Sequence, residues 1–504
     1  MAAKQLSIMN RLINFALLTL MTAVPEVVLS QAAPNSAGYS ISTPRPINPA
    51  ASTTNPSALA TQGQNPYLGS TPIGKVTDEV IPISLREAVD RGLRYNLGLI
   101  ESNQASAEVR AQRLRALSAL LPDVSVKGEE GFENISFKEV GLGRLPPIPG
   151  VGALPSTSGN FGYQDARISL SQSVYSQELH DRYRAERSAE KASAYSTRDA
   201  RDVVVYAVGV AYLQVAASVA RVETARAQLA SAEELDRQTT DQVRHEVSPE
   251  IDSIRAQVEL QTAQQNLTNA TDALEKDKLA LGRIIGLPVD QQFALSDSAG
   301  YRPLASLTRE SATEEALQSR SDLRSAEASV RAAEYGVGAE KAQRYPAIAL
   351  NANYGGAGVN VGSFNSVYGV AGTISIPIFT GGRIRADIQE AQANLARRRA
   401  EYEDLKGRVA YDVRVAWLDL QASDSGVKVA EKNQILAERA LVQSRDRYSN
   451  GVTNYLEVLQ AQETLTAARE NYIQSLYSFN VAKIALARAM GVAEQHFSDF
   501  FGGK

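Results

Sequence analysis

Four polar side chains on two predicted helices are the residues of this chain of 504 residues best placed to act on ions. Glu457 and Gln460 lie three residues apart, and Asp252 and Arg255 repeat this spacing earlier in the chain. Residues three apart share one face of a helix, so Asp252 and Arg255 can form an ion pair. The chemistry that these groups offer is electrostatic, because a carboxylate attracts cations and repels anions.

Patterns typical of enzymes and of metal centres are absent from the sequence. His180, His245 and His496 are far apart, and there is no cysteine. The lack of cysteine excludes a disulfide framework, a thiol nucleophile, cysteine-ligated metal and a lipid anchor on cysteine. No phosphate-binding glycine motif occurs. We therefore expect no enzymatic activity, no metal and no cofactor, and the net charge of −4 gives no electrostatic case for nucleic acid.

The four polar residues follow breaks that end two very long helical segments. Helical periodicity without proline covers residues 175–242 and again 383–448. Another long helical segment follows each break, which predicts two antiparallel helical hairpins. Helices of this length need partner helices along their whole run. The residues of the two breaks are Val247, Ser248 and Pro249, and Gly451, Val452 and Thr453.

The same order of segments occurs twice, in residues 81–290 and 311–491, with a linker at 291–310. In each copy a helical segment ends at a proline, Pro122 or Pro346, and two alternating segments follow before the long helix. An internal repeat of this kind indicates a unit that cannot bury its own apolar surface alone.

The alternating segments predict strands with one apolar and one small, polar face. Val124 corresponds to Ile348 of the second copy and Leu170 to Ile374, so both copies keep the same faces. This pattern is typical of strands that face lipid and cross a bilayer, although a half-buried soluble sheet alternates in the same way. The apolar faces of the second copy contain Ile348, Leu350, Ala352 and Tyr354, and Tyr368, Val370, Gly372, Ile374 and Ile376.

Four strands per chain cannot close a barrel. An open sheet edge is not tolerated in lipid, where no water satisfies the backbone. The smallest bacterial barrels contain about eight strands, so a barrel built from this chain must be shared by two or more subunits.

The ends of the chain differ in composition from the repeats. In residues 1–30, Lys4 and Arg11 precede an apolar run and small residues, the order of a secretory signal peptide. A membrane anchor is the alternative, but a proline and a glutamate interrupt the run. Residues 31–80 are rich in Pro, Ser and Ala and predict a flexible extension, and 492–504 form a tail. No other segment approaches about 18 consecutive apolar residues.

Residues 84–491 resemble the TolC-type outer-membrane efflux protein family. The resemblance rests on Ile-Pro-Ile-Phe-Thr-Gly-Gly-Arg at 376–383, on the break within 447–462 and on Arg-Ser-Asp-Leu at 320–323, where the family has proline at the second position. The loop at 131–159 is longer than its counterpart in the second copy, and by analogy it lies outside the cell.

The resemblance implies a mixed α and β membrane protein. We expect long α-helical hairpins and four transmembrane β-strands per chain, closing in a homotrimer as one twelve-stranded barrel in the cell outer membrane, with a helical tunnel in the periplasm. Its function would be the exit duct of a tripartite efflux or type I secretion system. Its partners would be a periplasmic adaptor and an inner-membrane pump or secretion ATPase. A structural coiled coil or envelope tether without a pore explains the helices but not the proline–strand–strand junctions.

The resemblance also gives roles to the two helix ends. Acidic residues just past the tip surround the axis in the family, which assigns a periplasmic gate to Glu457 and Gln460, with Asp252 and Arg255 in the first copy. The six residues of the breaks, 247–249 and 451–453, would form the tip that contacts the adaptor. An ordinary solvated helix face and simple turns remain the alternatives.

Overall fold

Long helices and one four-stranded sheet dominate the computed structural model, which describes residues 65–136, 156–246, 248–297, 300–304 and 307–495, all within one compact unit. The helices are α2 (Leu85–Tyr95), α3 (Leu97–Ser118), α4 (Gln177–Arg244), α5 (Glu250–Ile285), α6 (Arg309–Ser319), α7 (Ser321–Ala342), α8 (Arg383–Ser449) and α9 (Tyr455–Met490). The strands are β1 (Ile81–Ile83), β2 (Asp123–Glu133), β3 (Phe161–Tyr175), β4 (Phe293–Leu295), β5 (Ala347–Gly358) and β6 (Asn365–Ser375). Two short 3-10 helices are η3 (Pro66–Leu68) and η5 (Val361–Ser363).

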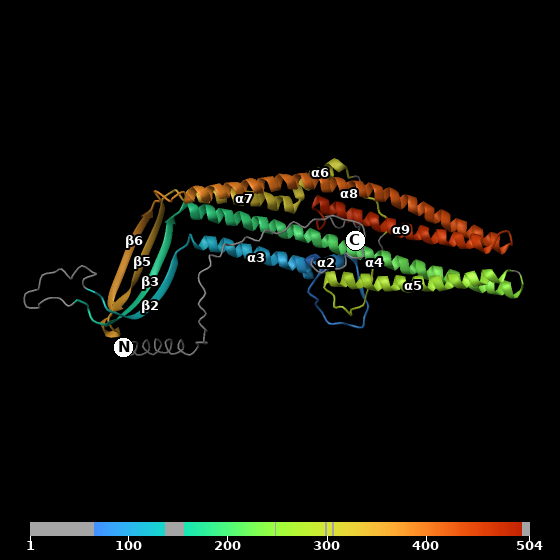
Figure 1. Ribbon diagram of the computed structural model, residues 1–504, viewed down its shortest axis with the longest axis horizontal. Coiled ribbons are helices and arrows are strands. Elements are labelled where there is room, and N and C mark those ends of the chain that lie inside the picture. The colour runs from blue at the N-terminus through green and yellow to red at the C-terminus, as the bar shows by residue number, and fades with distance from the viewer. Residues whose placement is uncertain (1–64, 137–155, 247, 298–299, 305–306, 496–504) are drawn as a thin grey trace, which may run out of the picture. The chain divides into compact units, whose positions relative to one another are not determined.

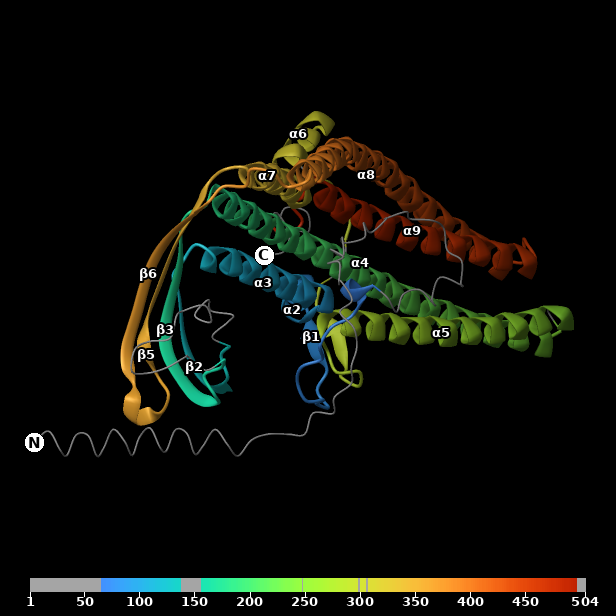
Figure 2. The same cartoon turned by 60° about the vertical axis from the view of Figure 1, so that its left-hand side comes forward.

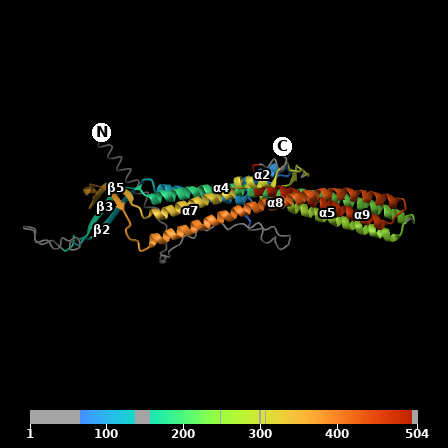
Figure 3. The ribbon, with the colours of Figure 1, turned by 90° about the horizontal axis from the view of Figure 1, so that it is seen from above.

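The sheet and the helical turns lie at opposite ends of the long helices. Figure 1 shows β2, β3, β5 and β6 at one end of α4 and α8, and the α4–α5 and α8–α9 turns at the other. Helices α5 and α9 run back beside α4 and α8, as the view from above also shows (Figure 3). The predicted long helices are confirmed, since α4 has 68 residues and α8 has 67.

The helices begin and end at residues that satisfy their free backbone groups. The Ser176 side chain accepts a hydrogen bond from the Leu179 backbone at the start of α4, and the Asn454 side chain accepts one from Glu457 at the start of α9. Helix α9 ends at Gly491, which has φ 72°, a left-handed conformation that glycine adopts at little cost. The Asn454 cap begins α9 directly after the α8–α9 turn, where the sequence predicts a break.

The four-stranded sheet is antiparallel throughout, in the order β2-β3-β5-β6. The central pair joins the two halves of the chain, with Leu170 of β3 opposite Ala352 of β5. Strands β2 and β6 are the edges of this sheet, and Figure 2 shows them on its two sides. A separate parallel pair, β1 and β4, lies beside the helices.

The core of the helical part is centred on α4. Val204, Val205 and Val208 are fully buried, and a Cβ atom on Gly209 would lie 2.7 Å from Ile484 of α9, so the two helices approach closely. Helix α4 holds an 18-residue window with a mean hydropathy of 1.9, half of it buried in the chain. The expectation that no segment past residue 30 approaches such an apolar run is therefore wrong. Other helices pack around the middle of α4, so apolar side chains are needed on several sides of this helix.

Three segments predicted as extension, linker and tail pack on the helices. Of the extension, residues 65–80 are described, and the Ser70 hydroxyl there donates a hydrogen bond to the Arg283 backbone carbonyl. The linker contains β4, which pairs with β1. Val492 and Ala493 of the tail are buried. These segments contain apolar residues that pack on the helices. The average composition of each segment does not show them, so this packing is not predicted from the sequence.

The Arg-Ser-Asp-Leu motif joins α6, α7 and α8. Arg320 is 6% exposed, and its guanidinium donates hydrogen bonds to the carboxylates of Asp322 (Nη2 to Oδ2, 2.6 Å) and Asp412 of α8 (Nη1 to Oδ2, 3.0 Å). Two carboxylates compensate the burial of this charge. The motif therefore has a structural role at the helix junction.

Asp202 of α4 is a buried carboxylate that holds the start of the segment after α9. It is 6% exposed, and its Oδ1 accepts a hydrogen bond from the Glu494 backbone nitrogen at 3.0 Å. Burial raises the pKa of Asp202 from 3.8 to about 6, and the hydrogen bond from Glu494 and the charge of Arg488 offset part of this rise. The ionised form therefore destabilises the folded protein at neutral pH.

We predict that Asp202→Asn stabilises the protein at pH 8 by up to about 2 kcal/mol, because asparagine keeps the acceptor oxygen and removes the buried charge. The raised pKa means that the wild-type stability present in full below about pH 4 is lost as the pH rises through 6, so the gain must shrink between pH 7 and pH 4. Thermal unfolding in detergent across this range measures the effect. Exposed Asp419 supplies the control, Asp419→Asn. Equal destabilisation by Asp202→Asn at pH 5 and pH 8 would contradict the prediction.

Candidate functional site

Apolar side chains form continuous rows on one face of the four-stranded sheet. Most of them are exposed to the surroundings; Val126 is 76% exposed and Tyr368 is 80% exposed. The predicted strand faces are confirmed by the register, which pairs residues of the same kind across all four strands. The rows are Val126–Ile168–Tyr354–Tyr368 and Val124–Leu170–Ala352–Val370. An apolar sheet face left uncovered in water is costly, so this face requires an apolar environment.

The opposite face of the sheet carries small and polar side chains. Ser125, Ser169 and Asn353 follow one another in a row across β2, β3 and β5. In the next row the Ser171 hydroxyl donates a hydrogen bond to the Asn351 side-chain oxygen at 3.0 Å. A sheet with one apolar and one polar face separates lipid from water.

The residues predicted for the helix tip lie in the two turns. In the α8–α9 turn, Gly451 has φ 71° and Val452 is 67% exposed, while Thr453 is half-buried. In the α4–α5 turn, Ser248 is half-buried and Pro249 is exposed. Val247 lies outside the described residues.

The two turns share one left-handed backbone position but differ in the residue that occupies it. Glu246 has φ 58°, in the left-handed region where the second turn has Gly451. A residue with a Cβ atom is strained in this region, typically by about 1 kcal/mol compared with glycine. The first turn is therefore held in shape by its neighbours.

A small apolar cluster holds the two hairpins together near their tips. It contains Leu235, Ala256, Ala437, Leu441, Tyr455, Val458, Leu465 and Ala468, from α4, α5, α8 and α9. Beside it, the Tyr448 hydroxyl donates a hydrogen bond to the Gln242 side-chain oxygen at 2.7 Å. The Ser248 hydroxyl donates to the same oxygen at 2.9 Å. Gln242 thus links α8 to the α4–α5 turn.

Glu457 is the carboxylate predicted for the gate, and groups of its own chain hold it at the start of α9. Its carboxylate accepts a hydrogen bond from the Thr453 hydroxyl, and its Oε1 lies 3.7 Å from Nε of Arg447. The sequence motif contains Arg447 but does not show that α8 brings it to Glu457. This neighbouring cation compensates part of the negative charge of Glu457.

The other predicted gate residues lie on α9, which also carries Glu457, and on α5. Gln460 is exposed, one turn after Glu457. Asp252 and Arg255 form the ion pair that their spacing suggests, with Arg255 Nη1 3.4 Å from Asp252 Oδ1. Tyr455 and Ala256 meet in the tip cluster, so both pairs belong to one tip.

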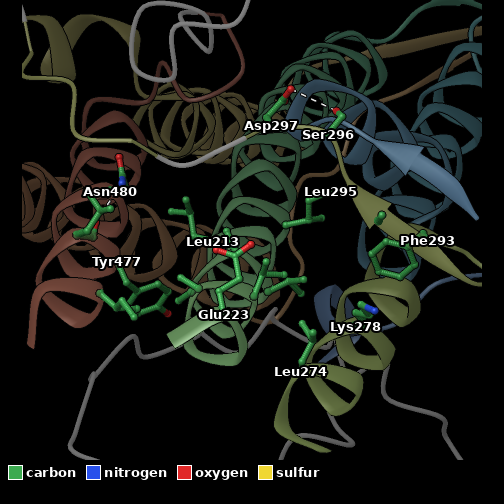
Figure 4. Close-up of a pocket in the computed structure, with 18 of the residues that line it drawn as sticks. Leu213, Glu223, Leu274, Lys278, Phe293, Leu295, Ser296, Asp297, Tyr477 and Asn480 are labelled. Atoms are coloured by element: carbon green, nitrogen blue, oxygen red, sulfur yellow. Dashed lines mark hydrogen bonds between the residues drawn. The ribbon is translucent and has the colours of Figure 1, made fainter. Parts of the chain in front are cut away.

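A hollow with a volume of about 510 Å³ lies between α4, α5, β4 and α9. Its walls are mainly apolar, with Leu213, Phe293 and Tyr477 among the side chains in Figure 4. Among the described residues no group of three or more His, Cys, Asp or Glu could hold a metal ion. His180 and His245 are exposed, and His496 lies outside the described residues.

The combination of helical hairpins with this sheet is the fold of outer-membrane channels. It matches the outer-membrane channel MtrE of Neisseria gonorrhoeae with a TM-score of 0.69 and 20% identity, covering 84% of this chain and 95% of that one. The structure of CusC matches with a TM-score of 0.67 and 20% identity, covering 84% of this chain and 99% of that one. At this identity the likeness establishes the fold.

Two segments, residues 96–287 and 312–492, match the family described as outer membrane efflux protein, and the chain belongs to this family. The toluene efflux pump outer membrane protein TtgF of Pseudomonas putida is 28% identical over 355 residues, 67% of this chain and 71% of that protein. The cation efflux system protein CusC of Escherichia coli is 28% identical over 232 residues, 45% of this chain and 49% of that protein. The resemblance found in the sequence is confirmed, and the protein is an efflux channel of the outer membrane.

Neighbouring residues on the two faces of β6 provide a test of the sheet. We predict that Val370→Arg strongly reduces assembly into the outer membrane, because a charge on the lipid face costs about 2–4 kcal/mol near the bilayer centre. Ala371→Arg is the matched control, since its side chain lies on the polar face beside Asn351. Membrane fractionation measures assembly. Equal loss in both variants would show that the two faces do not differ in environment.

Proposed function

We propose that three copies of the chain close one barrel of twelve strands and form the exit duct of a tripartite efflux system. The observation that carries this proposal is the open four-stranded sheet, which has an apolar face and two edge strands, β2 and β6. The backbone groups on the outer sides of these edges need partners in lipid, and β6 of one copy can supply them to β2 of the next. The number three comes from the family resemblance.

The helical tips are the proposed docking site for a periplasmic adaptor. Val452 and Pro249 are exposed at the two turns, farthest from the sheet. Exposed apolar residues on a rigid turn are suited to contact a partner protein. The chain has no nucleotide-binding motif, so an inner-membrane pump would supply the energy for transport. A secretion ATPase is the corresponding partner if the system is of type I.

The assembly and the pore can be tested on the same sample. We predict a trimeric mass for the detergent-solubilised protein by light scattering, and ion conductance after reconstitution into planar bilayers. A structural tether would give no conductance. A stable monomer that conducts would contradict the shared barrel, and a trimer that never conducts would contradict the duct.

Glu457 is the proposed gate residue, with Gln460, Asp252 and Arg255 around it at the tip. Three copies of Glu457 would surround the axis at the start of α9, where carboxylates favour the passage of cations. Arg447 weakens this effect, since it lies 3.7 Å from Glu457 in the same chain. The proposed gate is therefore mildly rather than strongly cation-selective.

We predict that Glu457→Gln lowers the selectivity for cations over anions and the block by multivalent cations, because Arg447 is then left without its carboxylate. Gln460→Glu is the matched variant and should raise both, since it adds a carboxylate on the same helix face. Planar-bilayer recordings measure selectivity and block, and light scattering checks that the trimer is intact. If neither variant changes the recordings, Glu457 does not line the pore.

A further inference from the structure

Four charged side chains lie close together on the polar face of β2 and β3. Lys127 and Arg167 are opposite each other in one row of the sheet, and Glu129 and Asp165 are opposite each other in the next. We call these four residues the collar. The order of the rows is the same on both strands, with the two cations nearer to the helices and the two carboxylates nearer to the β2–β3 connection.

Each cation of the collar is neutralised by a carboxylate on its own strand. Lys127 Nζ lies 2.5 Å from Glu129 Oε2, and the Arg167 guanidinium donates through Nε to Asp165 Oδ1 at 2.7 Å. The Tyr163 hydroxyl donates a further hydrogen bond to Glu129 at 2.7 Å. The collar therefore carries charges of both signs and no net charge.

The neighbouring strands add no charge to the two rows of the collar. In the row of the cations, β5 and β6 contribute Gly355 and Val367, and in the row of the carboxylates they contribute Ala357 and Asn365. The other acidic residues on this face of β2 are Asp123 and Glu133 at its two ends. Each is four residues, about 13 Å, from the collar, which exceeds a Debye length of about 8 Å at physiological ionic strength.

We propose that the collar balances charge at its own level in the strand section of the pore, so that the collar itself does not select solutes by the sign of their charge. The inference rests on the proposed barrel, in which the polar sheet face lines the pore and each collar residue occurs three times. Ions of either sign then pass the collar, and selection by charge is left to other charged groups, which are Asp123 and Glu133 at the two ends of β2 and the residues of the helical tip. Loss of one collar residue would leave three unbalanced charges of the opposite sign around the pore.

Paired substitutions on β2 test this inference in planar bilayers. We expect Lys127→Gln to raise the permeability ratio of potassium to chloride about threefold and Glu129→Gln to lower it by a similar factor, because three uncompensated charges act within a Debye length of the ions. The double variant Lys127→Gln with Glu129→Gln should return to the wild-type ratio. Ser125→Gln, on the same face without a charge, should leave the ratio unchanged.

The β3 pair supplies an independent repeat if a β2 variant fails to assemble. Arg167→Gln should shift the ratio in the direction of Lys127→Gln, and Asp165→Asn in the direction of Glu129→Gln. The role proposed for the collar is wrong if the permeability ratio shifts in the same direction when either sign of charge is removed, or if it does not shift in variants that conduct. Neither result contradicts the proposed exit duct. A wild-type trimer without conductance overturns the duct and the collar together.

Discussion

The hydrogen-bonding groups of the backbone at the edges of the sheet constrain the rest of the molecule. A chain that presents a large apolar face on four strands must place that face in lipid, where an open edge has no water to bind. The strand register joins apolar residues of all four strands into rows on one face, such as the row from Val126 to Tyr368. The long helices carry the two strand hairpins, β2–β3 and β5–β6, on a common support.

The elements of the fold are predicted from the sequence because their signals are local. Proline at 122 and 346, period-two alternation after it and long proline-free helices each depend on residues that are neighbours in the chain. The packing of residues 65–80, of β4 and of Val492 is not predicted, because it depends on contacts between distant segments. The apolar middle of α4 has the same origin, since its environment is made by other helices.

The candidate site shows the same division between local and distant information. The ion pair of Asp252 with Arg255 is implied by their spacing on one helix. The approach of Arg447 to Glu457, the link from Tyr448 to Gln242 and the left-handed conformation of Glu246 are not, because each depends on how a turn closes. The sequence thus reveals a charged residue at the start of a helix. Its net electrostatic effect depends on neighbours that only the folded structure brings close.

The pairing of β3 with β5 has a consequence for how the chain folds. Each helical hairpin and each outer strand pair joins segments that follow one another, but Leu170 of β3 meets Ala352 of β5 across more than a third of the chain. Contacts between distant segments form slowly, because the loop between them must first close. The hairpins can therefore form while later residues are still emerging from the export machinery. The sheet has to wait for the second half of the chain, and during that interval its apolar strands need protection from aggregation.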